Sequence, residues 1–189
     1  DIIINELLSN PPAGGKDYVE VYNNSDKILN LGTMVLGTWD STKNKIENPK
    51  DISYENHLIF PGDYYCLTTD PDAIKELYDT PNPKGFIKME SMPSYNNDNG
   101  IVTIGDKSLK LFDKLTYYPE MHLPLLNSTK GVSLERISFS RPTEDLTNWH
   151  SASSEVGFWT PAYKNSQYAE FVHDENPFTI VPEIFSPDN

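Results

Sequence analysis

The chain has 189 residues and carries 28 Asp and Glu against 15 Lys and Arg, which gives a formal net charge of −13. The excess of acids is spread evenly, with 15 acids and 8 bases in residues 1–95 and 13 acids and 7 bases in residues 96–189. Such a surface repels phosphate backbones, so we expect no nucleic-acid partner. No run of 18 apolar residues is present, so we expect no membrane insertion. The single cysteine, Cys66, excludes a disulfide framework and a cysteine-based zinc site.

Short alternating runs of apolar and polar residues, bounded by Gly, Pro and Asn, predict many β-strands. In chain order the expected strands cover residues 2–8, 18–22, 28–31, 58–60, 64–68, 101–104, 109–112 and 131–137. Pro61-Gly62 predicts a tight turn between two of these strands, and Gly105-Asp106 predicts a hairpin turn between two others.

One short helix is expected over residues 70–78. Asp70 suits the N-cap, Pro71 suits the first helical position, and Asp72 suits the positive end of the helix dipole. Pro81 prevents the helix from continuing much further. Many strands with so little helix predict an all-β fold, a two-sheet antiparallel sandwich of seven or more strands.

Several short motifs follow one another in the order seen in a known family. They are Ile4-Asn5-Glu6-Leu7, the DYVEVYN run at 17–23, Ile28-Leu29-Asn30-Leu31, the run from Leu58 to Thr68, the GVSLER run at 131–136, and the closing WHSAS and TPAYKN runs at 149–153 and 160–165. From Ile2 to Asn165, this pattern resembles the lamin tail domain of bacterial proteins. The chain departs from that family at Gly32-Thr33-Met34, where a tryptophan is usual, so Met34 or Trp39 is expected to fill its volume.

The resemblance implies an immunoglobulin-like sandwich over residues 1–168. It also implies a larger exported Gram-negative protein, found outside the cell, on its surface or in the periplasm. The end of the chain, from residue 178 onward, resembles the entry strand of modules near the C-termini of large secreted Gram-negative proteins. Residues 169–189 are therefore interpreted as an extended connector to a following module, and the chain as a piece of a longer one.

Two glutamates inside apolar strands require partners. Glu6 and Glu20 are each flanked by apolar residues, and strand alternation places Glu20 on the same face as Tyr18 and Tyr22. A buried carboxylate needs a cation or hydrogen-bond donors. We therefore expect a structural ion pair of Glu6 and Glu20 with Arg136, or with backbone donors, in preference to a catalytic acid–base pair.

Catalytic motifs are incomplete. Ser133 begins a G-x-S pattern without the closing glycine, and it stands on an alternating strand where a nucleophile elbow needs a strand-to-helix turn. The four histidines are far apart in the sequence. We expect no enzyme activity, no catalytic residues and no cofactor.

Three other kinds of surface site remain as alternatives. Calcium is a minor one, at residues 96–99 or at Asp70 and Asp72, although neither place has the D-x-D-x-D-G pattern. Sugar-contact aromatics are a second, with Trp39 and Trp159 as the loop-like tryptophans. The third is O-glycosylation at Ser41 or Thr42, because the run at 40–42 resembles an acceptor used in some Gram-negative bacteria.

The function expected from these observations is a non-catalytic structural or adhesive module. Its partners would be neighbouring domains of the same chain or other cell-surface proteins. Two alternatives from other classes stay open, a carbohydrate-binding β-sandwich module and an accessory domain of a secreted nuclease or phosphoesterase.

Overall fold

The computed structural model describes residues 1–170, which form twelve β-strands and one α-helix. Strand accounts for 35% of the structure. The strands are β1 (Ile2–Leu8), β2 (Tyr18–Asn23), β3 (Leu29–Asn30), β4 (Met34–Asp40), β5 (Lys45–Asp51), β6 (Leu58–Ile59), β7 (Tyr64–Thr68), β8 (Phe86–Lys88), β9 (Gly100–Asp106), β10 (Leu111–Tyr117), β11 (Leu134–Arg136) and β12 (Trp149–Ser151). The helix is α1 (Pro71–Leu77), and 3₁₀ turns lie at Leu31–Thr33, Pro119–Met121, Leu146–Asn148 and Ser154–Val156.

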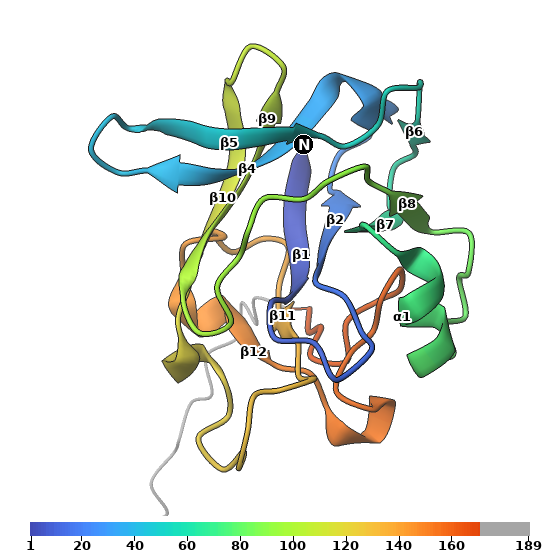
Figure 1. Cartoon of the computed structure of the whole chain (residues 1–189), viewed down its shortest axis with the longest axis vertical. Coiled ribbons are helices and arrows are strands. Elements are labelled where there is room, and N and C mark those ends of the chain that lie inside the picture. The colour runs from blue at the N-terminus through green and yellow to red at the C-terminus, as the bar shows by residue number, and fades with distance from the viewer. Residues whose placement is uncertain (171–189) are drawn as a thin grey trace, which may run out of the picture.

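The strands form two main sheets and a small ribbon. The larger sheet has the order β12-β11-β1-β2-β7-β8, the smaller sheet has the order β10-β9-β4-β5, and β3 pairs with β6. Figure 1 shows β1 and β2 of the larger sheet between β9–β10 on one side and α1 on the other. The mostly-β fold with more than one sheet agrees with the sequence prediction.

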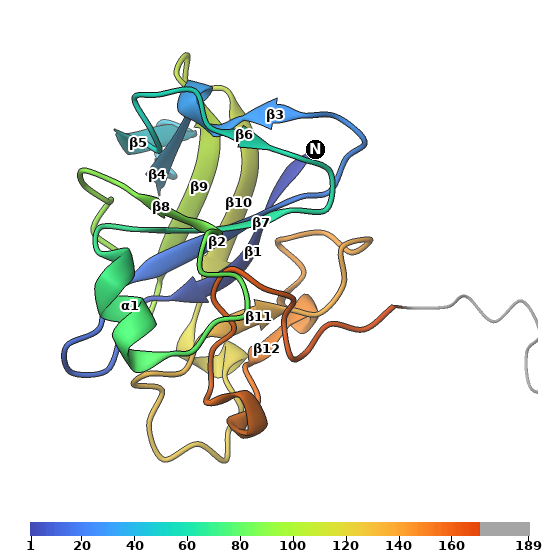
Figure 2. The same cartoon turned by 90° about the vertical axis from the view of Figure 1, so that its right-hand side faces the viewer.

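One pair of strands departs from the predicted antiparallel arrangement. β7 and β8 run parallel, with Cys66 opposite Phe86 and Thr68 opposite Lys88. Two neighbouring parallel strands need a crossover connection, because a tight hairpin reverses the chain. Helix α1 lies in that connection, as Figure 2 shows.

Helix α1 forms where the sequence predicts it. Oδ1 of Asp70 accepts a hydrogen bond from the backbone N–H of Ala73 at 3.4 Å, and Pro71 occupies the first turn. Ile74 is fully buried and holds the helix against the larger sheet. No other α-helix is found in residues 1–170.

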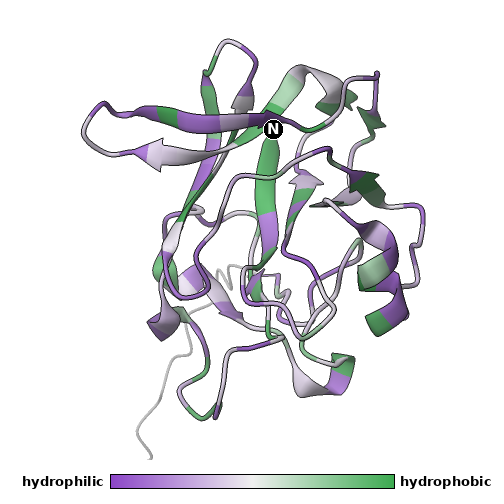
Figure 3. Cartoon of the chain, in the orientation of Figure 1, coloured by the Kyte–Doolittle hydropathy of each residue, from purple (hydrophilic) through white to green (hydrophobic). Residues whose placement is uncertain are grey.

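Two hydrophobic clusters bury both faces of the larger sheet. The main core lies between the sheets and includes Ile4, Leu7, Val19 and Val21 of the larger sheet with Leu36, Val102, Ile104 and Leu115 of the smaller one. A second cluster covers the opposite face with Leu8, Tyr18, Cys66, Ile74, Trp159 and Ala162. Strand β1 is therefore buried on both sides. In Figure 3 it is a green, hydrophobic strand interrupted by one purple, hydrophilic stretch, which corresponds to Asn5 and Glu6.

The predicted connector begins within the described residues and continues beyond them. The backbone N–H of Ala169 donates to the carbonyl of Ile137 at 2.9 Å, so the chain is still bonded to the rest of the fold at this position. Residues 171–189, including the segment that resembles another module, lie outside the described residues.

The first prediction concerns Gly105 on β9. A Cβ atom at this position would lie 2.5 Å from the carbonyl oxygen of Lys110 and 2.5 Å from Cδ1 of Ile46. Because a backbone atom cannot move aside cheaply, Gly105→Ala is expected to lower the free energy of unfolding by about 1–3 kcal/mol in urea titration. The control Lys45→Ala, on the exposed face of β5, is expected to stay within about 0.5 kcal/mol of wild type. Equal stability of the two variants would contradict the packing described.

Candidate functional site

Three glutamates from adjacent strands form a row across the larger sheet. Glu6 on β1 is directly opposite Glu20 on β2 and, on its other side, opposite Glu135 on β11. Directly opposed residues point to the same face of a sheet. All three side chains are fully buried. Because Val19 and Val21 face the main core, alternation puts Glu20 and the whole row on the other face.

A β-bulge in β1 brings an amide into this row. The register of β1 against β2 shifts between Ile4 and Glu6, which leaves Asn5 as the extra residue. Nδ2 of Asn5 donates to Oε1 of Glu20 at 2.8 Å and to Oδ1 of Asn165 at 2.8 Å. The bulge therefore supplies Glu20 with a donor from the neighbouring strand.

Hydroxyl groups and backbone N–H groups satisfy the carboxylate at the centre of the row. Oε1 of Glu6 accepts from the hydroxyl of Tyr18 at 2.6 Å, from the hydroxyl of Ser133 at 2.5 Å and from the backbone N–H of Thr160 at 2.9 Å. Oε2 of Glu6 lies 3.3 Å from the hydroxyl oxygen of Thr160. The donors come from β2, from the residue before β11 and from the chain after Phe158.

The outer two carboxylates are bound mainly by that same stretch of chain. Oε2 of Glu20 accepts from the backbone N–H of Ala162. Glu135 accepts from the hydroxyl of Thr160 at 2.6 Å, from the hydroxyl of Ser166 at 2.7 Å and from the backbone N–H of Gln167 at 2.8 Å. We call residues 158–168 the closing segment, because they cover the row. Figures 1 and 2 show this red-orange stretch beside β1, β2 and β11.

Asn165 fastens the closing segment to the sheet. Its Nδ2 group donates to the carbonyl of Asn5 and to the carbonyl of Arg136, both at 2.9 Å. Its Oδ1 accepts from Asn5, so the two amide side chains bind each other. Residues more than 150 positions apart in the sequence are thereby joined at one point.

Burial and mutual repulsion raise the pKa of two carboxyl groups in this row, those of Glu6 and Glu20. Burial, together with the charge of Glu135, raises the pKa of Glu6 from 4.5 to about 8. Burial and the neighbouring Glu6 raise the pKa of Glu20 as well. In both residues the hydrogen bonds received act in the opposite direction but do not outweigh burial.

The contacts of Thr160 accommodate a proton on Glu6. Its single hydroxyl lies 2.6 Å from Oε1 of Glu135 and 3.3 Å from Oε2 of Glu6. One hydroxyl donates only one hydrogen bond, and the shorter contact is with Glu135. A protonated Oε2 of Glu6 then donates to the Thr160 oxygen, which agrees with the raised pKa of Glu6.

The predicted ion pair with Arg136 is wrong. In the described part of the chain, neither Glu6 nor Glu20 has a salt bridge. Consecutive residues of a strand point to opposite faces, so once Glu135 joins the row its neighbour Arg136 faces away from it. The alternative partner that the sequence allowed, a backbone donor, is present at both glutamates.

Arg136 is instead buried on the opposite side of the sheet. Its Nη2 lies 3.5 Å from Oδ2 of Asp113 on β10, and its Nε donates to the carbonyl of Ile4 at 2.8 Å. The guanidinium carbon lies 5.2 Å from the ring centroid of Trp149. Arg136 therefore connects the larger sheet to the edge strand of the smaller sheet.

The two tryptophans proposed as sugar contacts do not form a platform. Trp159 is 5% exposed and stacks on Tyr18 with ring centroids 6.4 Å apart, so the predicted surface role is wrong for this residue. Trp39 is half-buried beside a pocket of about 250 Å³, with Nζ of Lys114 5.3 Å from its ring centroid. Of these two tryptophans, only Trp39 keeps an accessible side chain that a sugar ring could contact.

The remaining predicted sites lie on separate turns. Ser41 and Thr42 are exposed in the turn between β4 and β5, where Oδ1 of Asp40 accepts from the backbone N–H of Thr42 at 2.9 Å. The carboxylate of Asp70 caps α1. Residues 1–170 contain no group of three or more His, Cys, Asp or Glu side chains arranged to hold a metal ion.

The structure brings together a serine and a histidine that the sequence did not suggest. Nδ1 of His122 lies 2.9 Å from the hydroxyl of Ser151, which also accepts from the backbone N–H of Leu123 at 3.0 Å. Burial, with a smaller contribution from His150, lowers the pKa of His122 to about 4. A histidine with so low a pKa is a poor general base near neutral pH.

Comparison of the chain with models of protein families, with curated proteins and with solved structures gives no match. None of the helices in residues 1–170 has the length and the apolar character that a membrane crossing needs.

The second prediction concerns the pH dependence of stability. Unfolded Glu6 loses its proton near pH 4.5, whereas folded Glu6 keeps it up to about pH 8. Folding takes up a proton between these values, so Glu6 makes the free energy of unfolding fall as the pH rises, and this one group contributes at most about 1.4 kcal/mol per pH unit. Urea unfolding at a series of pH values measures this slope.

Other titrating groups determine the pH range in which the contribution of Glu6 to the slope can be measured. Asp17, whose pKa burial raises to about 6, adds to the decline below that pH, whereas buried His122 opposes it between about 4 and 6.5. Above about pH 6.5 Glu6 continues the decline up to about pH 8, and the raised pKa of Glu20 acts in the same direction. Glu6→Gln keeps one acceptor oxygen for the three donors and offers an N–H to Thr160, so it imitates the protonated acid and is expected to reduce the slope. An unchanged slope in this variant would contradict the account.

The third prediction distinguishes the hydrogen-bonding roles of Glu6 and Glu20 by their stability after substitution with glutamine. Glu20 accepts one donor at each oxygen, from Asn5 and from Ala162. A protonated Glu20 still accepts at both oxygens, because its hydroxyl oxygen keeps a lone pair, whereas the amide nitrogen of a glutamine accepts no hydrogen bond. Glu20→Gln therefore leaves one of the two buried donors unpaired. Its free energy of unfolding is expected to drop by about 1–3 kcal/mol near pH 6, where Glu6→Gln is nearly neutral. Equal loss in both variants would show that the donor pattern is incorrect.

Proposed function

We propose that this chain is a non-catalytic structural or adhesive module of a larger exported bacterial protein. In this proposal it has the immunoglobulin-like fold of the lamin tail type, and its partners are neighbouring domains of the same chain or other cell-surface proteins. The sequence resemblance supports the family, and two features of the structure support the kind of function.

The first supporting feature is the use of the ionisable groups. Glu6, Glu20 and Glu135, the groups most like a catalytic acid–base set, are sealed beneath the closing segment. Ser133, which begins the incomplete nucleophile motif, donates its hydroxyl to Glu6 and is fully buried. A catalytic group must reach its substrate, so this arrangement favours a structural role.

The convergence of the motifs supports the resemblance itself. The run around Glu6, the run around Glu20, the GVSLER run and the closing run at 160–165 all contribute side chains or backbone groups to one hydrogen-bonded row. Motifs that match by chance have no reason to meet in space. Their meeting indicates that the pattern marks the framework of one domain.

The observation that carries the contact function is an exposed apolar surface on the β3–β6 ribbon. Ile28, Leu58 and Phe60 are each about half exposed, at 56%, 47% and 50%. Leu29 pairs with Ile59 and both face inward, so their neighbours Ile28 and Phe60 come together on the outer side. We call Ile28, Leu58 and Phe60 the ribbon surface. Apolar side chains grouped on a polar protein commonly mark a contact site.

The fourth prediction tests this surface in the parent protein in its own cells. A photo-reactive phenylalanine analogue in place of Phe60 is expected to cross-link to a defined partner, whereas the same analogue in place of Glu76, exposed on α1, is not. Adding Ile28→Asp to the Phe60 probe is expected to reduce the adduct about tenfold or more, because a carboxylate disrupts an apolar contact. Equal labelling at both positions, or no effect of Ile28→Asp, would contradict the proposal.

A further inference from the structure

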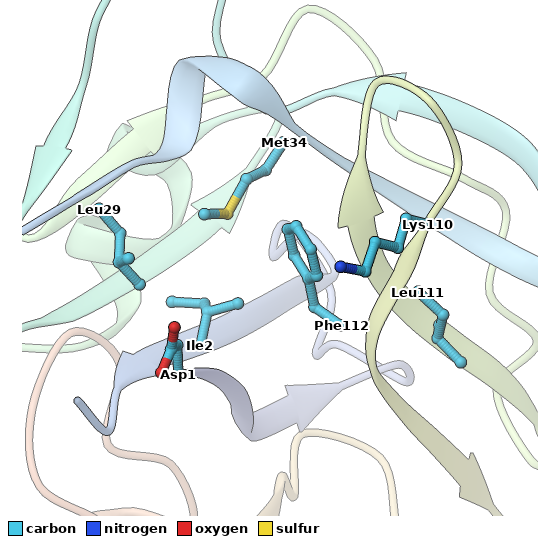
Figure 4. A pocket seen from close by; sticks show the side chains of 7 residues that line it. All are labelled: Asp1, Ile2, Leu29, Met34, Lys110, Leu111 and Phe112. Carbon is cyan, nitrogen blue, oxygen red and sulfur yellow. The ribbon is translucent and has the colours of Figure 1, made fainter. Parts of the chain in front are cut away.

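An apolar pocket opens between the end of β3 and the β9–β10 hairpin, apart from the glutamate row. It has a volume of about 290 Å³. Ile2 and Met34 form its floor, with only 3% and 6% of their surface exposed, and Leu29 and Phe112 stand on opposite sides. Figure 4 shows these side chains arranged around a common space.

A lysine supplies the positive charge of the pocket. Lys110 is part of the pocket lining, and Figure 4 shows its side chain with the ammonium group directed toward the ring of Phe112. No salt bridge joins Lys110 to any acid of residues 1–170. The carboxylate in the pocket lining, that of Asp1, is already bound to Lys27 at 3.0 Å. Asp106 of the same turn attracts the Lys110 ammonium group without a direct salt bridge, so in a chain with 13 excess negative charges Lys110 is an exposed cation available beside an apolar surface.

The hairpin turn holds this lysine in place. Oδ1 of Asp106 accepts from the backbone N–H of Ser108 at 2.8 Å and from the backbone N–H of Lys110 at 3.0 Å. Leu109 has a φ of 67°, a left-handed conformation that is unfavourable for a bulky residue, and it is 39% exposed. The turn thus fixes the backbone at Lys110, whose side chain lines the pocket.

We propose that this pocket binds a small amphiphilic carboxylate. The apolar body lies between Leu29 and Phe112 over Ile2 and Met34, and the carboxylate pairs with Lys110. The volume corresponds to about ten water molecules, so the ligand has roughly ten non-hydrogen atoms. A medium-chain fatty acid or an arylalkyl acid has this size and this distribution of charge.

Titration of the ¹⁵N-labelled chain with octanoate, followed by backbone NMR shifts, tests the proposal. Octanamide and octylammonium are the matched neutral and cationic probes. We expect saturable shifts centred on Ile2, Met34 and Phe112, with octanoate at least about tenfold tighter than octanamide, because the charged head group contributes a charge-assisted hydrogen bond. Octylammonium is expected to bind more weakly than both.

Three variants assign the effect to named residues. Lys110→Gln is expected to reduce octanoate binding to the level of octanamide, and Phe112→Ala to weaken both probes. Lys130→Gln is the control: Lys130 is exposed elsewhere on the chain, and its loss changes the net charge by the same amount as Lys110→Gln. This variant is expected to leave octanoate binding unchanged. The dispersion of the same spectra shows whether each variant is folded.

Several outcomes would overturn the inference. Shifts that do not saturate by about 10 mM octanoate, or that spread over the surface, would exclude a pocket of this kind. Equal affinities for octanoate and octanamide, or the same loss in Lys130→Gln as in Lys110→Gln, would exclude the assigned role of Lys110. Binding of a short peptide ending in leucine, without binding of octanoate, would assign the site to a protein partner instead.

Discussion

Three carboxyl groups that share one buried face of a sheet, with no cation among them, form the constraint on which the rest of the structure depends. Each needs hydrogen-bond donors, because an unpaired buried carboxylate is too costly to tolerate. β1 and β2 provide Asn5 and Tyr18, and Ser133 stands just before β11, but the remaining donors come from the closing segment. The last part of the sandwich is therefore held in place by the first, and the fold is complete only when residues 158–168 lie over the row.

The two faces of β11 show how one strand serves two purposes. Glu135 contributes to the row, and the next residue, Arg136, points the other way and meets Asp113 of the smaller sheet. Removing the positive charge would leave Asp113 with an unpaired charge in a largely buried place, an effect that commonly costs several kcal/mol. The same three-residue strand therefore fastens the closing segment on one side and the second sheet on the other.

Local patterns predicted eight of the twelve strands and helix α1, because alternation, turn residues and caps are encoded within a few neighbouring positions, whereas β4, β5, β8 and β12 were not predicted. The row could not be predicted in this way. Whether Glu6 faces Glu20 and Glu135 depends on the register of three distant strands and on the bulge at Asn5. The expected partner, Arg136, directly follows Glu135 in β11, so its side chain points to the opposite face of the sheet. Trp159 resembled a loop residue because the chain around it has no strand pattern, although it packs on Tyr18 in the second cluster.

The proton on Glu6 is the central claim of this account, and carboxyl carbon NMR measures it most directly. A ¹³C titration of the glutamate Cδ signals, assigned with Glu6→Gln and Glu135→Gln, follows each group separately. The account predicts that Glu6 remains protonated at pH 6 and titrates near pH 8, the value to which burial and Glu135 raise its pKa. Titration of Glu6 near its ordinary value of 4.5, with the chain still folded, would contradict it.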